Sequence, residues 1–185
     1  SVKEAQDIIL NSVSKLKNTE LVRIDEALGR IIANDVVSKE NIPPFNNSAM
    51  DGFAIKAKDS FGASKKSPSM LEVIEDLPAG YVAAKDIRRG ECIRIMTGAP
   101  VPKGADSVIM VEDTLPETRN QSTETRKKEF VKIFKEMKPG ENIRNAGEDI
   151  RNGEVVIKKG TILDSAHIGI LASLGITKIK AIRRP

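Results

Sequence analysis

The sequence predicts an α+β fold rich in β-strands, in which one domain is inserted into another. Short strand-like segments separated by Gly, Pro and Ser clusters fill the middle of the chain, whereas helical patterns occur only near its two ends. The character of the chain changes after the loop at residues 43–54 and changes back near residue 152. One arrangement explains both changes: residues 1–45 and 146–185 form a discontinuous domain, and residues 46–145 form a β-rich domain inserted into it.

The composition is that of a globular protein with few aromatic residues. The 185 residues are 39% hydrophobic, 30% charged and 3% aromatic, so the core must be built from Ile, Val, Leu and Ala. The net charge of +4 comes from 30 basic and 26 acidic residues that are interspersed, which argues against a nucleic-acid-binding face. The single cysteine favours a reducing, cytoplasmic location. No apolar run approaches the ~20 residues that span a bilayer, so no membrane partner is expected.

The two ends of the chain carry the helical patterns. Apolar residues on one face predict a helix over residues 2–17, and Asp164 or Ser165 caps a second helix that runs to residue 174 before Gly175. Asp25 is a plausible N-cap of a short helix that Gly29 ends. The segments that read as strands in this part of the chain are residues 21–24, 31–37, 154–157 and 176–182.

The middle of the chain reads as a series of short strands. The spacing of apolar residues predicts strands at residues 53–57, 71–74, 93–96, 108–111 and 130–134. Residues 119–129 are strongly polar and read as a hairpin tip or a flexible excursion. Cys92 alternates with apolar residues and is expected to fill a core, and the lone His167 near a helix start is expected to be structural.

The loop Pro43-Pro44-Phe45-Asn46-Asn47-Ser48-Ala49-Met50-Asp51-Gly52-Phe53-Ala54 is the stretch around which the chain is organised. Two prolines fix the incoming backbone, Asn and Ser side chains hold turns, and Gly52 allows a backbone angle that other residues resist. Asp51 therefore lies on a stiff loop where a carboxylate can be aimed at a ligand. The alternative is a tight turn before a strand, with Asp51 as its cap.

A second loop follows a predicted strand in Arg94-Ile95-Met96-Thr97-Gly98-Ala99-Pro100-Val101-Pro102-Lys103-Gly104-Ala105-Asp106. Thr97 offers a hydroxyl that can donate or accept, and Gly98 lets a ligand approach the backbone closely. Such a loop can hold an oxyanion, although it matches neither a Walker loop nor a dinucleotide-binding fingerprint. The alternative is a proline-rich turn between two strands.

A third loop combines a guanidinium with two acids in Pro139-Gly140-Glu141-Asn142-Ile143-Arg144-Asn145-Ala146-Gly147-Glu148-Asp149-Ile150. Arg144 is the residue type that holds phosphates and other oxyanions with two hydrogen bonds. Glu148 and Asp149 could hold Mg²⁺ or water. The alternative is an internal pair between Arg144 and a carboxylate that stabilises a crossover between domains.

Taken in order, these three motifs resemble the N-terminal region of the MoeA family, the molybdopterin molybdenumtransferases that include the gephyrin E domain. The resemblance covers essentially all 185 residues. It implies a discontinuous domain with an inserted, barrel-like β-rich domain. In the family, a larger α/β domain similar to molybdopterin adenylyltransferase follows, and then a small C-terminal β-barrel. Members are elongated homodimers whose active cleft lies between the inserted domain of one subunit and the α/β domain of the other.

The resemblance also implies a function in molybdenum cofactor biosynthesis. Members insert molybdenum from molybdate into adenylylated molybdopterin and release AMP in a step that needs a divalent cation, usually Mg²⁺. Matched residue by residue, Asp51, Thr97 and Asp149 are the expected catalytic residues. The resemblance leaves the metal ligands open, and Asp51 or Asp149 could be one of them. The residues expected to bind substrate or anion are Ser48, Gly98, Arg144 and Glu148.

Two departures from the family pattern qualify this expectation. The family usually has an acid where this chain has Asn46. The α/β domain would begin where the sequence ends at Pro185, so we expect the chain alone to be inactive and its N-terminal helix to lack a packing partner. The alternative functions are a non-catalytic dimerisation, scaffold or substrate-binding module, or one half of a split insertase. The expected partners of the chain are a second copy of itself, the molybdopterin adenylyltransferase or a missing C-terminal half.

Overall fold

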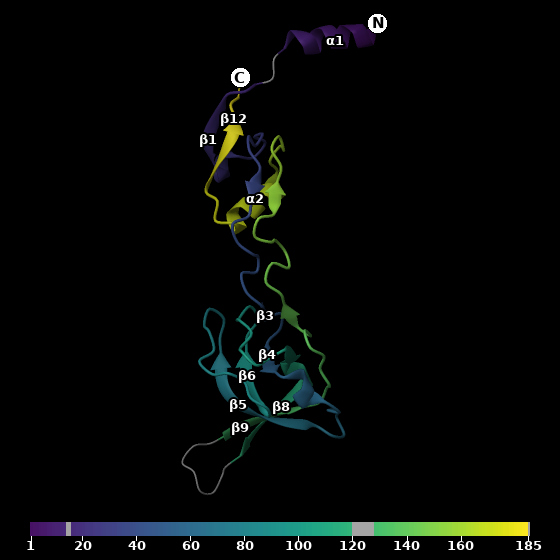
Figure 1. Cartoon of the computed structure of the whole chain (residues 1–185), viewed down its shortest axis with the longest axis vertical. Coiled ribbons are helices and arrows are strands. Elements are labelled where there is room, and N and C mark those ends of the chain that lie inside the picture. Colours follow the sequence, from purple (N-terminus) through teal and green to yellow (C-terminus); the bar gives the residue numbers. More distant parts are fainter. Residues whose placement is uncertain (14–15, 120–127, 185) are drawn as a thin grey trace. The chain divides into compact units, whose positions relative to one another are not determined.

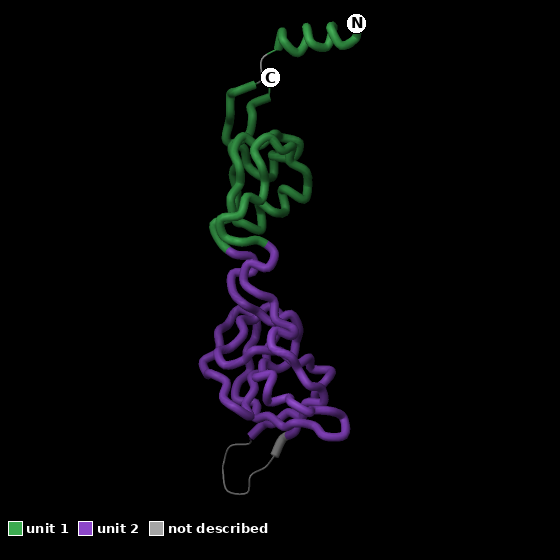
Figure 2. Tube along the Cα trace, turned by 45° about the vertical axis from the view of Figure 1, so that its right-hand side comes forward, with its two compact units in different colours: residues 1–40, 150–185 green, residues 41–149 purple. Residues whose placement is uncertain are grey.

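The computed structural model describes residues 1–13, 16–119 and 128–184. The chain divides into two compact units (Figures 1 and 2): Ser1–Glu40 with Ile150–Pro185 form the first, and Asn41–Asp149 form the second. The first unit is thus assembled from both ends of the chain, and the second is a continuous segment. The domain limits drawn at residues 45 and 146 stay a prediction, because compactness alone does not show which segments fold independently.

Helix α1 (Val2–Ser12) is shorter than the helix predicted over residues 2–17. It begins at a capping box in which the Ser1 side chain accepts a hydrogen bond from the Glu4 N–H. It ends because the backbone of Val13 is extended, and the β-branched Val13 and the hydroxyl of Ser12 both weaken a helix. Residues 14 and 15 lie outside the described ranges. No residue of α1 is buried.

The core of the first unit combines two short strand pairs with one helix. β1 (Thr19–Arg23) pairs antiparallel with β12 (Lys178–Ile182), and β2 (Val36–Val37) pairs antiparallel with β11 (Val155–Ile157). Helix α2 (Ser165–Ser173) adds its buried Leu171 to the same cluster. The largest buried side chains of this cluster are Ile32, Ile157, Leu163, Leu171 and Ile179.

The strand predicted over residues 31–37 is not continuous. Ile31 and Ile32 form only isolated bridges, and a bend separates them from β2. Within that bend the Asp35 carboxylate accepts a hydrogen bond from the Lys159 N–H at 2.6 Å, so a polar turn contact interrupts the apolar run.

The prediction that Asp25 is the N-cap of a short helix is also wrong. Asp25 lies inside the 3₁₀ helix η1 (Ile24–Glu26), where its carboxylate accepts hydrogen bonds from the Arg23 guanidinium. The predicted cap of α2 is confirmed, because Asp164 accepts from the His167 N–H at 3.0 Å. His167 is the third residue of the helix, and its ring accepts from the Asp164 N–H to complete the capping box. This contact agrees with the prediction that His167 has a structural role.

The second unit is built on one curled six-stranded sheet with the order β7-β4-β6-β5-β9-β8 (Figure 1). Strand β4, next to the edge strand β7, pairs antiparallel with β6 and β7, so that Phe53 lies opposite both Arg94 and Ile109. The strand bounds are β4 Gly52–Ile55, β5 Ser69–Leu77, β6 Glu91–Ile95, β7 Ser107–Met110, β8 Thr114–Arg119 and β9 Lys128–Ile133. The short β3 (Asn47–Ser48) and β10 (Ile143–Arg144) form a separate antiparallel pair.

Alternation along these strands produces two apolar clusters in the second unit. The first cluster contains Phe53, Ile55, Cys92, Ile109 and Val131, and the second contains Ala54, Ile93, Ile95 and Val108. Cys92 is fully buried, as predicted, and burial raises the pKa of its thiol to about 12.

Strand β8 was not predicted, and β5 is longer than the predicted strand at residues 71–74. β8 lies at the edge of the sheet and contains Pro116, and an edge strand tolerates polar residues and proline. Its antiparallel partner is β9. Between them, residues 120–127 of the predicted hairpin tip or excursion lie outside the described residues.

Candidate functional site

Strand β3 lies between the other two loops that the sequence singled out. On one side the Gly98 N–H donates to the Ser48 carbonyl at 2.9 Å, and the Ser48 N–H donates to the Ala99 carbonyl at 3.0 Å. On the other side Ile143 and Arg144 pair with Ser48 and Asn47 in the β3–β10 ladder. Segments separated by some 50 and 100 positions in the chain therefore meet on a two-residue strand.

The turn after β3 is fixed by the Ser48 side chain. Ser48 is buried, and its hydroxyl donates to the Met50 carbonyl at 2.6 Å while it also lies 3.3 Å from the Met50 N–H. The Ala49 N–H donates to the carbonyl of Asn142, a residue with φ +58°. The Ser48 hydroxyl is thus engaged within the loop, and it shapes the turn that leads to Asp51.

Asp51 and Thr97 are in direct contact. One carboxylate oxygen of Asp51, Oδ1, accepts from both the backbone N–H and the hydroxyl of Thr97, each at 2.7 Å. These two hydrogen bonds, the backbone bond first, hold the pKa of the Asp51 carboxyl below its usual range. The side chain is exposed, so it presents an ionised oxygen to solvent.

Gly52 is required where it stands. A Cβ atom at this position would lie 1.9 Å from the Ile109 carbonyl oxygen, because β4 passes close to β7. The Asp51 carbonyl accepts from the Val111 N–H at 3.1 Å, which extends the same contact. The Asp-Gly pair therefore joins the exposed acid directly to the sheet.

Arg144 forms ion pairs with the two acids of its own motif. Its guanidinium donates to Asp149 Oδ2 at 2.5 Å, and its Nε lies 3.8 Å from Glu148 Oε1. The hydrogen bond to Asp149 raises the pKa of Arg144. All three side chains are 41–50% exposed. The internal Arg-to-carboxylate pair weighed as an alternative is thus present, in a position that solvent can reach.

The backbone around Arg144 is bonded to the loop at residues 42–46. The Gly147 N–H donates to the Pro43 carbonyl and the Asp149 N–H donates to the Ile42 carbonyl, each at 2.9 Å. Asn46 Oδ1 accepts from the Ala146 N–H at 2.8 Å. A carboxylate could accept the same bond, so Asn46 preserves this contact without the negative charge expected there.

The structure brings the predicted residues together in two groups on either side of β3. Asp51, Thr97 and Gly98 form one group, and Arg144, Glu148 and Asp149 form the other. Within the described ranges, no hydrogen bond or ion pair joins the side chains of the two groups. That they line one wall of an anion-accepting groove stays a prediction.

A pocket of about 370 Å³ opens beside Asp51. Its lining includes Phe53, Arg94, Met96 and Val111, which the sequence analysis did not assign to a site. Their proximity follows from the register of β4, β6 and β7, and spacing along the chain gives no signal of it.

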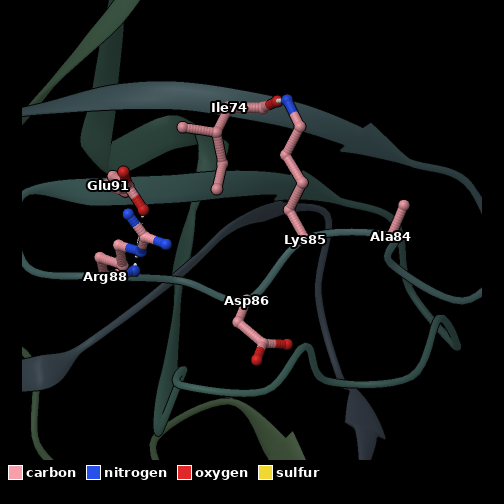
Figure 3. Close-up of a pocket in the computed structure, with 6 residues that line it drawn as sticks. All are labelled: Ile74, Ala84, Lys85, Asp86, Arg88 and Glu91. Carbon is pink, nitrogen blue, oxygen red and sulfur yellow. Dashed lines mark hydrogen bonds between the residues drawn. The ribbon is translucent and has the colours of Figure 1, made fainter.

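A larger pocket of about 520 Å³ lies elsewhere in the second unit, between Ile74 and the segment 84–91 (Figure 3). Two of its charged side chains are bonded to the backbone: Lys85 Nζ donates to the Ile74 carbonyl at 2.6 Å, and the Arg88 backbone N–H donates to the Glu91 carboxylate at 2.9 Å. No residue of the three motifs is among those that line this larger pocket.

In the described part of the chain, no group of three or more His, Cys, Asp or Glu side chains could hold a metal ion. Mg²⁺ is often held by one or two carboxylates together with substrate phosphates, and Asp51 or Asp149 could each provide one such ligand. In the same residues, no helix has the length and apolar character needed to cross a membrane.

Comparison with known proteins decides the family. The profile of the MoeA N-terminal region (domain I and II) matches residues 1–175. The chain belongs to this family. A MoeA crystal structure from Pyrococcus horikoshii OT3, described as a molybdopterin biosynthesis protein, is 38% identical with a TM-score of 0.86, over 99% of this chain and 46% of that one.

Curated relatives of this MoeA-family chain are named molybdopterin molybdenumtransferase. The protein from Staphylococcus epidermidis RP62A is 42% identical over 185 residues, which are 100% of this chain and 42% of the relative. The protein from Bacillus subtilis strain 168 is 36% identical over 171 residues, or 92% of this chain and 38% of the relative. The chain therefore spans about two fifths of the length of these relatives.

Proposed function

We propose that this chain is the N-terminal part of a molybdopterin molybdenumtransferase, which inserts molybdenum from molybdate into adenylylated molybdopterin and releases AMP. The observation that supports this most is the contact between Asp51 and Thr97 beside β3, with the Arg144 group bonded to the same strand. Family membership and the names of the relatives point to the same reaction.

The residues of the two groups then have different tasks. Asp51 and Thr97 act as one unit, in which Thr97 orients the carboxylate and keeps it ionised. Arg144 binds the oxyanion of molybdate or of the phosphates, and for this it exchanges one of its carboxylate partners for the substrate. Glu148 and Asp149 hold the guanidinium until then. Gly98, whose N–H donates to the Ser48 carbonyl, and Ser48 shape the loop. Mg²⁺, held by Asp51 or Asp149 with substrate phosphates, would neutralise negative charge.

A hybrid enzyme tests this function. Residues 1–185 replace the matching 42% of the Staphylococcus epidermidis relative, and molybdenum insertion is measured with adenylylated molybdopterin, molybdate and Mg²⁺. We expect insertion by the hybrid, none by the relative lacking this segment, and a loss of about 10²-fold or more in the hybrid with Asp51→Asn. Arg23→Gln, in an exposed ion pair of the first unit, is the control. A folded hybrid without insertion, or Asp51→Asn at full activity, would contradict the proposal.

We also propose that the chain assembles through its first unit, as a homodimer or with the remaining part of the enzyme. Exposed apolar side chains on α1 support this: Val2, Ile8, Ile9 and Leu10 are 61–82% exposed. The paired substitution Ile8→Lys and Ile9→Lys should shift the mass measured by light scattering toward the monomer, whereas Lys3→Gln should not. Equal masses for parent and variant would favour a contact elsewhere. A scaffold without catalysis is the result if the hybrid assembles but does not insert molybdenum.

A further inference from the structure

The pocket beside Asp51 is an open end of the sheet interior. Phe53, Arg94 and Ile109 lie opposite one another on adjacent strands, on the face that carries the first apolar cluster. Phe53 lines the pocket and is buried, whereas Met96 and Val111, directly after the ends of β6 and β7, are 41% and 47% exposed. Apolar side chains thus stay uncovered at the mouth of a curled sheet, where small ligands often bind.

Two charged residues, Arg94 and Asp51, line this pocket. The Arg94 guanidinium lies 5.5 Å from the centre of the Phe53 ring, and its pairing with Asp76 is long, with Nε 3.5 Å from the carboxylate. Exposed pairs of this kind contribute little, so Arg94 is available to a ligand. Flat guanidinium groups stack well on aromatic rings.

Asp51 provides the opposite charge and a free acceptor. Thr97 donates both of its hydrogen bonds to Oδ1 of Asp51. In the described residues no donor contacts the other carboxylate oxygen, Oδ2. A carboxylate oxygen in this state accepts hydrogen bonds from N–H groups. A ligand that fits therefore has a planar apolar body and an edge with N–H donors.

We propose that this pocket binds a planar heteroaromatic ring of the substrate, with the ring face against Met96, Val111 and Arg94 and an N–H edge at Asp51 Oδ2. This rests on the proposed function, whose substrate carries two rings of that chemistry, the pterin and the adenine. Val111 and Met96 are then specificity-determining residues, and Asp51 accepts hydrogen bonds from the N–H edge of the ring.

The larger pocket in Figure 3 does not offer this combination. Its Lys85 is engaged by the Ile74 carbonyl, and its apolar surface is limited to Ile74 and Ala84. The pocket beside Asp51 joins an apolar lining to a carboxylate of the candidate site.

Binding of two probes to the 185-residue chain tests the proposal. Neopterin represents the pterin ring and adenosine monophosphate the adenine ring, and amide NMR titrations follow residues 51–53, 94–96 and 111. We expect one probe to shift these amides. Val111→Lys should weaken the binding of that probe by about tenfold or more, because the lysine side chain fills the pocket and pairs with Asp51. Val82→Lys, the same change at a residue 78% exposed outside the pocket, should leave affinity unchanged.

The outcomes separate this inference from the proposed function. If neither probe shifts these amides, or if both lysine variants weaken binding equally, the pocket is not a ring site. If the hybrid enzyme inserts molybdenum equally well with and without Val111→Lys, the inference fails while the function stands. If the hybrid is inactive but neopterin binding depends on Val111, the pocket stands and the function fails. The probe that binds more tightly identifies which ring occupies it.

Discussion

At the scale of single residues, Thr97 lowers the pKa of the Asp51 carboxyl. Removing its hydroxyl in Thr97→Val keeps the shape and the backbone N–H but deletes one of the two donors at Oδ1. We expect the pKa of the Asp51 carboxyl to rise part of the way to its ordinary value of 3.8, as measured by a carboxyl NMR titration. An unchanged midpoint would show that the backbone bond alone sets the pKa.

The same contact has a stability consequence with a fixed sign. Because the folded-state pKa of Asp51 is lowered, its carboxylate stabilises the fold above the unfolded pKa, and that contribution disappears as the pH falls through the folded pKa. Thr97→Val should therefore be less stable than the parent at neutral pH. The difference should shrink in acid, because both proteins then carry the protonated group.

Gly52 and Gly169 should respond in opposite directions to the same change. Gly52→Ala places a Cβ 1.9 Å from the Ile109 carbonyl oxygen, and strands in a sheet cannot separate without breaking their ladder. We expect a loss of about 1–3 kcal/mol or more in urea unfolding. Gly169→Ala meets nothing within 4 Å on helix α2 and should gain about 0.5–1 kcal/mol. A Gly52→Ala protein of parental stability would contradict the close approach of β4 and β7.

At the scale of elements, the loop at residues 143–149 is held to residues 42–48 by a short ladder and two loop hydrogen bonds, and the ion pairs of Arg144 with Glu148 and Asp149 brace the loop internally. Arg144→Gln removes the ion pairs and leaves the backbone bonds. We expect faster hydrogen exchange at the Gly147 and Asp149 amides, since local opening becomes easier. Exchange in Arg23→Gln should match the parent at these two amides, and equal exchange in Arg144→Gln would mean that the ladder suffices.

The elements that the sequence predicted well are those whose apolar pattern matches their burial. Strands near residues 53–57, 93–96 and 130–134 are found because Phe53, Ile93 and Val131 are buried in the sheet. The helix cap at Asp164 is found because an acidic N-cap before an apolar run is a local pattern. In each case the decisive interaction lies within a few residues or within one strand.

The elements that were missed or predicted wrongly depend on contacts between segments far apart in the sequence. Strand β8 owes its existence to pairing with β9 at a sheet edge, so its own residues carry little signal. The run at 31–37 looked like one strand, but the turn contact of Asp35 with Lys159 involves a segment far away in sequence. The candidate site divides in the same way. Its loops could be predicted from their residues, whereas the pocket containing Arg94 and Val111 depends on cross-strand register.

At the scale of the whole chain, we expect the second unit to fold alone. Two apolar clusters and the six-stranded sheet lie within it, and its ends meet where the Asp149 N–H donates to the Ile42 carbonyl. A polypeptide of residues 41–149 should therefore unfold cooperatively in urea and keep the amide spectrum of these residues. A collapsed or non-cooperative product would show that the first unit is required.

The burial of Cys92 gives experimenters a chain whose only native thiol is unreactive. A thiol with a pKa of about 12 and no solvent exposure forms almost no thiolate at neutral pH, and the thiolate is the form that maleimides attack. Cysteines introduced at exposed positions, such as Leu28 in the first unit and Val82 in the second, can then carry a pair of fluorescent dyes. Energy transfer between the dyes would report the distance between the two units in solution and its response to nucleotide.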